Sequence, residues 1–177
     1  MIELRFVTPD LRRIDESGAE VIGCGVYRDT RPLTGLAALL DWRMAGRLSK
    51  LAKQGFLVGE VGEVLVVPAR PRLPFDKLIA FGLGTRGSFA DATFRKVLER
   101  VLDSLAGLHV KKAVLELPGR GDPCIEPERA AAILLDVLGE DEQDALAFVE
   151  DDVGRKRIET HALERRRTAL RAQQARG

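Results

Sequence analysis

The pattern with the clearest chemical meaning is a glycine-rich turn in the middle of the chain. The sequence GLGTRG at residues 82–87 has the GxGxxG form, follows an apolar segment and precedes a predicted helix. Backbone amides in such a loop, together with a helix N-terminus, can bind a phosphate group. The candidate ligand residues for a phosphorylated nucleotide of the ADP-ribose type are Gly82, Gly84, Arg86, Gly87 and Ser88, with Arg86 as the phosphate partner.

The surroundings of this loop differ from those of a dinucleotide-binding loop. Glu116, at the end of the next predicted strand, lies 29 positions after Gly87, where an acidic residue that binds ribose is expected after about 20. The following helix is predicted to begin at Ser88, which leaves all three glycines in the loop. A tight turn made for packing would have the same sequence, so both interpretations stay open.

Other catalytic chemistry has little support. No CxxC, HxxxH or HExxH motif occurs, and the only histidines, His109 and His161, are 52 positions apart. The four serines lie outside any GxSxG motif. Cys24 is expected in the core and Cys124 in an exposed loop. We therefore assign no catalytic residue, no metal ligand and no cofactor.

Length and composition predict one globular domain. The 177 residues are 45% hydrophobic and 31% charged, which is enough to bury a substantial core. No apolar run reaches the roughly 18 residues of a membrane-spanning helix, and the N-terminus lacks the layout of a secretory signal. With two cysteines, a disulfide framework is excluded and a cytoplasmic location is expected.

Charge is distributed unevenly along the chain. Residues 155–177 carry eight basic and two acidic side chains, a balance of +6, whereas residues 1–154 carry 20 basic and 25 acidic, a balance of −5. The simplest interpretation is a solvated helix whose arginines lie against the acidic stretch 140–152. Contact with an acidic surface of a neighbouring subunit is the alternative. Because no aromatic residue follows Phe148, we expect no nucleic-acid partner.

Periodicity predicts alternating strands and helices. Strands are expected at Ile2–Val7, Glu20–Tyr27, Glu63–Val67, Lys77–Phe81, Lys111–Leu117 and Ala145–Glu150. Helices are expected at Leu33–Gln54 with a possible break at Gly46, at Ser88–Ala106 with Ser88 as N-cap, at Glu126–Leu138 ended by Gly139, and at 152–174. The last helix is expected to pack through its first half and to project through its second. Such alternation is typical of an α/β protein with helices on both faces of a sheet.

Several segments, in order, are similar to those of one known family. They are the FLVGEVGE turn at residues 56–63 with the following strand to Pro68, the strand Leu78–Gly84 followed by Phe89 and Arg95, and the segment Asp144–Asp152 leading into a charged helix. Together they resemble the N-terminal domain of the leucyl aminopeptidase, or cytosol aminopeptidase, family. The resemblance extends from about Val21 to about Arg167.

The resemblance implies a three-layer α/β/α sandwich with a mixed, mainly parallel sheet, related to macro domains. In this family two metal ions are held by a lysine and several carboxylates in a separate catalytic domain with the signature NTDAEGR. The chain contains no asparagine and is expected to end where that domain would begin. The resemblance therefore implies a non-catalytic binding or regulatory module that associates with itself or with a full-length aminopeptidase. Macro domains bind ADP-ribose, but with asparagines that this chain does not have.

Overall fold

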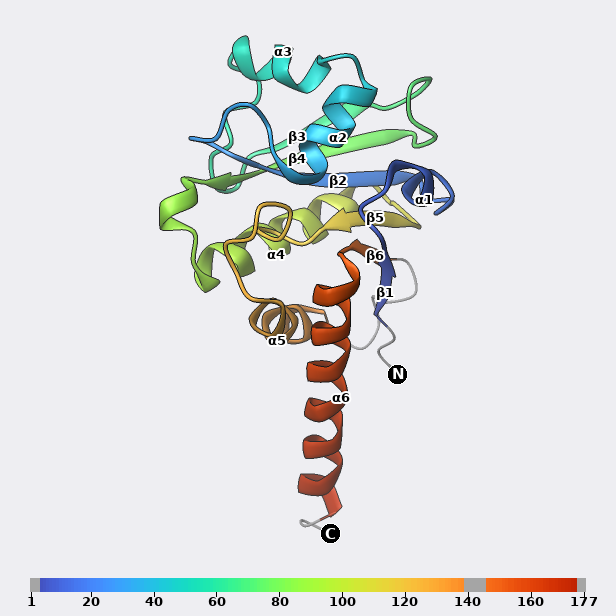
Figure 1. Ribbon diagram of the computed structural model, residues 1–177, viewed down its shortest axis with the longest axis vertical. Coiled ribbons are helices and arrows are strands. Elements are labelled where there is room, and N and C mark those ends of the chain that lie inside the picture. Colours follow the sequence, from blue (N-terminus) through green and yellow to red (C-terminus); the bar gives the residue numbers. More distant parts are fainter. Residues whose placement is uncertain (1–3, 139–145, 175–177) are drawn as a thin grey trace.

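The computed structural model describes residues 4–138 and 146–174, which fold around a six-stranded sheet with helices on both faces (Figure 1). The strands are β1 (Arg5–Val7), β2 (Val21–Tyr27), β3 (Val64–Pro68), β4 (Lys77–Gly84), β5 (Ala113–Glu116) and β6 (Leu146–Val149). Their order is β1-β6-β5-β2-β4-β3; every neighbouring pair is parallel except β3 with β4. The predicted mixed, mainly parallel α/β/α architecture is therefore confirmed.

The helices divide between the two faces of the sheet. They are α1 (Leu11–Asp15), α2 (Gly35–Arg43), α3 (Arg47–Lys53), α4 (Asp91–Gly107), α5 (Pro127–Val137) and α6 (Asp152–Gln174). Helices α1, α2 and α3 share one apolar cluster with the sheet, whereas α4, α5 and the start of α6 share the other (Figure 1). Each cluster buries one face of the strands, which accounts for the fully buried β2 and β5. No described helix is long and apolar enough to cross a membrane.

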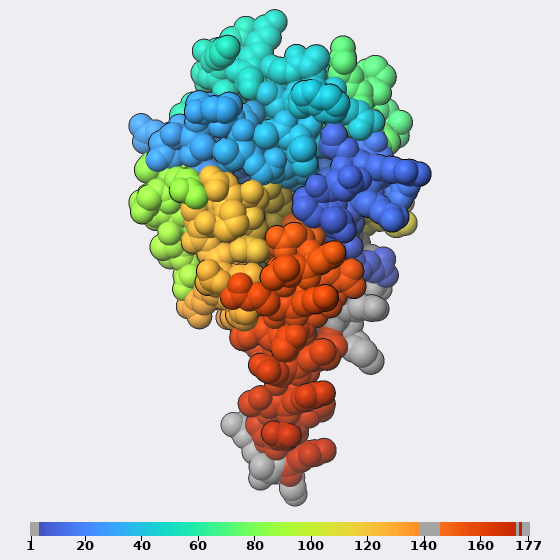
Figure 2. Space-filling view, in the orientation of Figure 1, coloured from blue at the N-terminus to red at the C-terminus, as the bar shows by residue number. Residues whose placement is uncertain are grey.

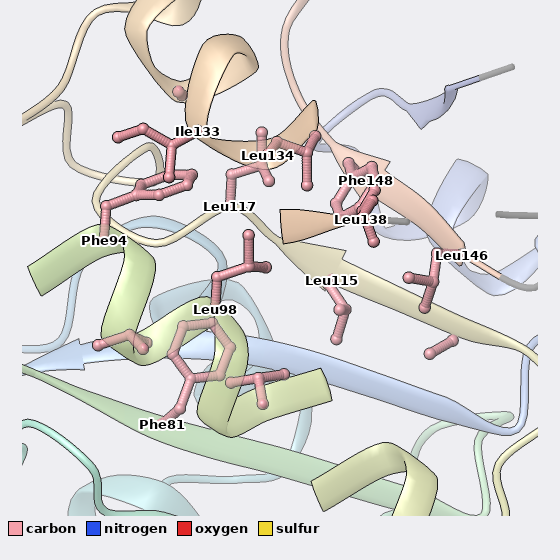
Figure 3. Packing of buried hydrophobic residues seen from close by; sticks show 14 of the residues in the cluster. Phe81, Phe94, Leu98, Leu115, Leu117, Ile133, Leu134, Leu138, Leu146 and Phe148 are labelled. Atoms are coloured by element: carbon pink, nitrogen blue, oxygen red, sulfur yellow. The ribbon is translucent and has the colours of Figure 1, made fainter. Parts of the chain in front are cut away.

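Helix α4 carries the most regular apolar stripe. Phe94, Val97, Leu98, Val101 and Leu105 are buried in the cluster shared with β4, β5 and α5, and Leu102 packs at its margin. Figure 3 shows Phe94 and Leu98 among the side chains of this cluster. Residues spaced three and four apart lie on one face of a helix, so the sequence pattern alone predicts this contact.

The structure corrects the predicted element boundaries at two helices. The expected helix Leu33–Gln54 is divided into α2 and α3, because Ala45 and Gly46 adopt left-handed conformations with φ of 56° and 78°. Helix α4 begins at Asp91 with Ala90 as its N-cap, so Ser88 does not cap it.

Further differences concern short elements. Ser88 belongs to a 3₁₀ turn in which its hydroxyl donates to the carbonyl of Thr85. The short helix α1 was not expected; it is capped by Asp10, whose carboxylate accepts from the amides of Arg12 and Arg13. The predicted cap Gly139 and the first residue of the predicted strand at Ala145 lie outside the described residues.

Candidate functional site

The strand order creates a crevice between β2 and β5. These neighbouring strands are parallel, but the helix after β2 lies on one face of the sheet and the helix after β5 lies on the other. In open α/β sheets, ligands bind at such a switch point, beyond the carboxyl ends of the strands. A cavity of about 410 Å³ lies there, lined by Pro9, Gly35, Leu36, Leu39, Glu116, Arg120, Gly121, Pro123, Val149, Glu150 and Asp151. We refer to it as the switch-point crevice.

Glu116 forms the inner wall of the switch-point crevice. It is the last residue of β5 and is buried. The amide of Gly25 donates to its Oε2 at 2.9 Å, and the amide of Leu36 donates to its Oε1 at 2.8 Å. Helix α2 receives no side-chain cap from Thr34, so the carboxylate of Glu116 satisfies one of its free N-terminal amides.

Burial changes the acidity of Glu116. Desolvation, together with the charge of Glu150, raises the pKa of this carboxyl to about 7, although the two backbone hydrogen bonds act in the opposite direction. The sequence suggested Glu116 only as a distant ribose ligand for the glycine loop. In the structure it is bonded to β2 and α2 instead.

A second buried acidic residue lies beside Glu116 and is paired. Arg120 donates to Glu150 through Nε at 2.9 Å and Nη2 at 2.8 Å, and its Nη1 donates to the carbonyl of Ile125 at 2.9 Å. The exposed fractions of the two side chains are 8% and 3%. Sequence reasoning missed this pair because its members are 30 positions apart and belong to no motif.

Glycines allow the two loops of the switch-point crevice to approach each other. Gly35 has a φ of 59°, and a Cβ there would lie 2.8 Å from the backbone of Gly121. A Cβ on Gly121 would lie 1.8 Å from Oε1 of Glu116. Both positions therefore require glycine, and the loops before α2 and after β5 close around the Glu116 carboxylate.

Gly82 and Gly84, which were expected in a loop, belong to strand β4, and four amides of the predicted phosphate-binding segment are bonded within the chain. Gly82 donates to the carbonyl of Glu63 at 3.0 Å, and Gly84 donates to that of Gly59 at 2.8 Å. The amide of Arg86 donates to Oδ1 of Asp29 at 2.9 Å, and that of Ser88 donates to the carbonyl of Thr85 at 3.1 Å.

Packing accounts for two of the loop glycines. A Cβ on Gly82 would lie 1.8 Å from the carbonyl oxygen of Glu60, and Gly84 has a φ of 75°. Around Gly87, in contrast, nothing lies within 4 Å of an added Cβ. The glycines at the start of the motif thus serve the contact between β4 and the segment before β3.

Arg86 connects this loop to the rim of the switch-point crevice. Its guanidinium pairs with Asp122 at 2.9 Å, and the hydroxyl of Tyr27 donates to the carbonyl of the same residue at 3.2 Å. The rings of Tyr27 and Phe89 pack edge to face. A phosphate at this loop would have to replace Asp122 and Asp29 as partners, so nucleotide binding at residues 82–88 stays a prediction.

The two cysteines differ in burial, and neither belongs to a metal-binding group among the described residues. Cys24 is buried in β2, where desolvation, followed by the charges of Glu116 and Asp41, raises the pKa of its thiol well above its usual value. Cys124 is half-buried, whereas it was expected to be exposed. Within residues 4–138 and 146–174, no group of three His, Cys, Asp or Glu side chains could hold a metal ion. These residues do not provide the donor set of a two-metal peptidase centre.

The basic helix α6 pairs with α5. Arg157 binds Glu126 at 2.7 Å and Glu128 at 2.6 Å, and Arg165 binds Asp136. The expected contact with the acidic stretch 140–152 is therefore wrong for these two arginines; residues 140–145 of that stretch lie outside the described part of the chain. The two helices run side by side, which brings the carboxylates of α5 close to the arginines of α6.

Beyond its first turns, α6 projects away from the body of the molecule (Figure 2). Ile158 is buried against the sheet layer, whereas Leu163 and Leu170 are 51% and 59% exposed. Arg167 and Arg171 are exposed on the same projecting part. This segment presents an apolar and basic surface.

Comparison with known proteins gives a family and a fold. The model described as "Cytosol aminopeptidase family, N-terminal domain" matches residues 21–143. A probable cytosol aminopeptidase of Pseudomonas fluorescens SBW25 is 33% identical over 87 residues, covering 49% of this chain and 18% of that protein. The cytosol aminopeptidase of Pseudomonas aeruginosa PAO1 is 30% identical over 113 residues, covering 62% and 22%. The chain thus spans about a fifth of the length of these relatives.

Solved structures with the same fold are macrodomains. The Oceanobacillus iheyensis macrodomain with MES bound has a TM-score of 0.68 and 11% identity, covering 91% of this chain and 90% of that one. The macrodomain of Mycobacterium tuberculosis DarG has a TM-score of 0.66 and 16% identity, covering 86% and 100%. The Oceanobacillus iheyensis macrodomain with ADP has a TM-score of 0.64 and 12% identity, covering 85% and 86%. The predicted macro-like fold is confirmed.

Proposed function

Because the chain belongs to the cytosol aminopeptidase family through its N-terminal domain, we propose that it is a non-catalytic cytoplasmic module that binds and regulates an aminopeptidase. The observation that carries this proposal is the matched region itself: residues 21–143 correspond to the domain that precedes the catalytic one. The chain contains no asparagine, so the NTDAEGR signature is absent from its sequence.

The projecting part of α6 is the surface that we propose for association. Leu163 and Leu170 lie seven positions apart and therefore on one side of the helix, flanked by Arg167. An exposed apolar side rimmed by basic side chains suits an acidic partner surface. The partner is a full-length cytosol aminopeptidase, and a second copy of this chain is the alternative occupant.

The test mixes the pure chain with a cytosol aminopeptidase and measures mass by light scattering and leucyl-anilide hydrolysis with manganese or zinc. We expect no hydrolysis by the chain alone, a heavier complex in the mixture and a changed rate. Replacing Leu163 and Leu170 by Asp should abolish the complex, whereas Trp42→Asp, at a 77% exposed position on α2, should not. Hydrolysis by the rigorously purified chain, or unchanged masses at every salt concentration, would contradict the proposal.

A nucleotide is the second candidate ligand. Support comes from the fold, since one structural neighbour is a macrodomain with ADP, and from the ion pair of Arg86 with Asp122, which lies between the crevice-lining residues Gly121 and Pro123. Thermal-shift and calorimetric titration with ADP-ribose, NAD and ADP tests it. A ligand at 100 times its Kd should stabilise the fold by about 2.7 kcal/mol. Arg86→Ala should remove the effect and Arg95→Ala should retain it; no shift with any compound would reject this function.

A further inference from the structure

Strand β3 forms one edge of the sheet, on the side of the molecule away from α6 (Figure 1). Its five residues, VLVVP, include no charged side chain, and its neighbour in the sheet is β4. Val67 is buried, whereas Val66 is 41% exposed and Pro68 is exposed as well. An apolar strand edge can pair with a strand of another chain unless charges, bulges or covering segments protect it.

The register of β3 with β4 determines which backbone groups of β3 point outward. In this antiparallel pair, Gly82 donates to the carbonyl of Glu63 at 3.0 Å, and Ala69 donates to that of Asp76 at 3.2 Å. Along an antiparallel pair, positions that exchange hydrogen bonds alternate with positions that do not. The odd-numbered positions of β3 therefore bond toward β4, and its even-numbered positions turn their backbone groups to the edge.

Two valines present four backbone groups at this edge. Val64 and Val66 each turn one N–H and one C=O outward, and these groups have no hydrogen-bond partner among the described residues. Pro68 has no N–H, and its carbonyl accepts from Nη1 of Arg47 on α3 at 3.4 Å. The edge thus offers a short row of two donors and two acceptors that ends at a proline.

We propose that two copies of this chain associate through their β3 strands, antiparallel and related by a two-fold axis, so that the two sheets become continuous. With Val64 of one copy opposite Val66 of the other, both donors and both acceptors of each strand are used, in four hydrogen bonds. Placing Val66 opposite its own counterpart instead would set the carbonyl of Val64 against Pro68, which has no N–H. The free groups of the edge are therefore self-complementary in one register.

The side chains of β3 support a second copy as the occupant. On one face of the joined sheets, Val64 and Val66 of each copy would lie beside Val66 and Val64 of the other, which covers the exposed valine. On the opposite face, the two-fold axis would pass between the half-buried Leu65 residues. Cross-strand pairs of β-branched and other apolar side chains stabilise antiparallel strands.

The charges that flank β3 favour the same arrangement. Glu60, before the strand, pairs with Arg28 at 2.8 Å, and Arg70, after it, pairs with Asp76 at 2.9 Å, so these charges are compensated within each copy. Antiparallel pairing also brings Glu60 of one copy toward Arg70 of the other, and these charges have opposite signs. The proposal goes beyond the regulatory function proposed above, because it concerns an edge of the sheet and not α6.

Light scattering and NMR amide exchange of the intact chain, from about 10 μM to about 1 mM, test the dimer. We expect the mass to rise toward twice that of the chain. The amides of Val64 and Val66 should exchange fast in dilute solution and about tenfold more slowly once about nine-tenths of the chain is paired, since only the free copies exchange. Leu65 and Val67, which bond to β4, should be protected at every concentration. This alternation distinguishes strand pairing from a contact made by side chains alone.

Substitutions at the edge provide the matched comparison. Val66→Lys should abolish the dimer, because it places a charge on the shared face of each strand. Val66→Thr keeps a β-branched side chain and the same backbone groups, so it should retain the dimer. Replacing Leu163 and Leu170 by Asp should also retain it, which separates this contact from association through α6.

Three results would overturn the proposal. The first is a monomer at the highest concentration, and the second is a dimer in which Val64 and Val66 still exchange fast or which Val66→Lys retains. The third is protection of these amides only on addition of an aminopeptidase, which would assign the edge to that partner and not to a second copy. Should Val66→Lys fail to fold, the concentration dependence of wild-type exchange decides.

Discussion

Arg120 and Glu150 form a buried bidentate ion pair that joins the loop after β5 to the end of β6. A buried pair is weak evidence for stability, because desolvation of both charges opposes their attraction. Removing one partner is different, because the remaining charge is left buried and unpaired. The two cases make different predictions for single and double variants.

Arg120→Met should destabilise the protein by about 3–5 kcal/mol, because Glu150 then remains buried without a counter-ion. The double variant Arg120→Met with Glu150→Met should recover most of that loss. Urea denaturation measures both. Arg157→Met removes two exposed ion pairs and is the control, for which little change is expected. A double variant as unstable as the single one would show that the pair itself, and not the orphaned charge, supplies the stability.

Gly82→Ala should lower the free energy of unfolding by at least about 2 kcal/mol, since the new Cβ would overlap the carbonyl oxygen of Glu60. Gly87→Ala in the same motif should change it by less than about 0.5 kcal/mol, because the space around it is open. Thermal or urea melts of the two variants measure the difference. Equal effects would mean that packing does not explain the glycine at position 82.

Ile158→Ala should cost about 2–4 kcal/mol, as the side chain is fully buried where α6 begins to pack on the body. Leu163→Ala, five positions later and half exposed, should cost less than about 0.5 kcal/mol in the isolated chain. Chemical denaturation followed by circular dichroism distinguishes them. A large effect of Leu163→Ala on the monomer would show that the projecting part is packed in solution.

The raised pKa of Glu116 predicts how stability depends on pH. Because the folded carboxyl, with a pKa of about 7, binds its proton more tightly than the unfolded one near 4.5, the folded state holds more protons between these values. The free energy of unfolding should therefore fall as pH rises from about 4.5 to 7, by roughly 3 kcal/mol from this group.

Urea denaturation of wild type and Glu116→Gln across pH 4.5–8 measures this dependence, and the variant should show a much flatter profile. Arg157 and Arg165 lower the pKa values of Glu128 and Asp136, so the stability that these two carboxylates contribute is lost only at more acidic pH. These two groups therefore do not contribute to the change in stability that Glu116 produces between about pH 4.5 and 7. Parallel profiles for the two proteins would show that Glu116 does not titrate in this range.

Local patterns predicted the elements of this fold well where one face of an element is apolar. The stripe from Phe94 to Leu105 identified α4, whereas the strand predicted to end at Phe81 continues to Gly84 as β4. The boundaries were less predictable. Ser88 has the residue type of an N-cap, yet it ends the 3₁₀ turn that begins at Arg86, where its hydroxyl donates to the carbonyl of Thr85. Helix α4 begins only after Ala90.

The candidate site was only partly predictable. Glycines at 82 and 84 were recognised, but their amides proved to be bonded to Glu63 and Gly59, segments that no loop motif identifies. Glu116 was noticed for its position after a strand and not for its contacts with Gly25 and Leu36. An acidic residue at the end of a buried strand is the signal that the sequence did contain.

By itself, the sequence determined the alternation of strands and helices and the family, because these depend on periodicity and residue type along short segments. Tertiary structure alone decided which distant groups meet. Glu116 reaches Leu36 across 80 positions, Arg120 reaches Glu150 across 30, and Arg165 finds Asp136 on α5. Such contacts depend on strand order and helix placement, and these arise from packing of the whole core, which no local pattern of residues specifies.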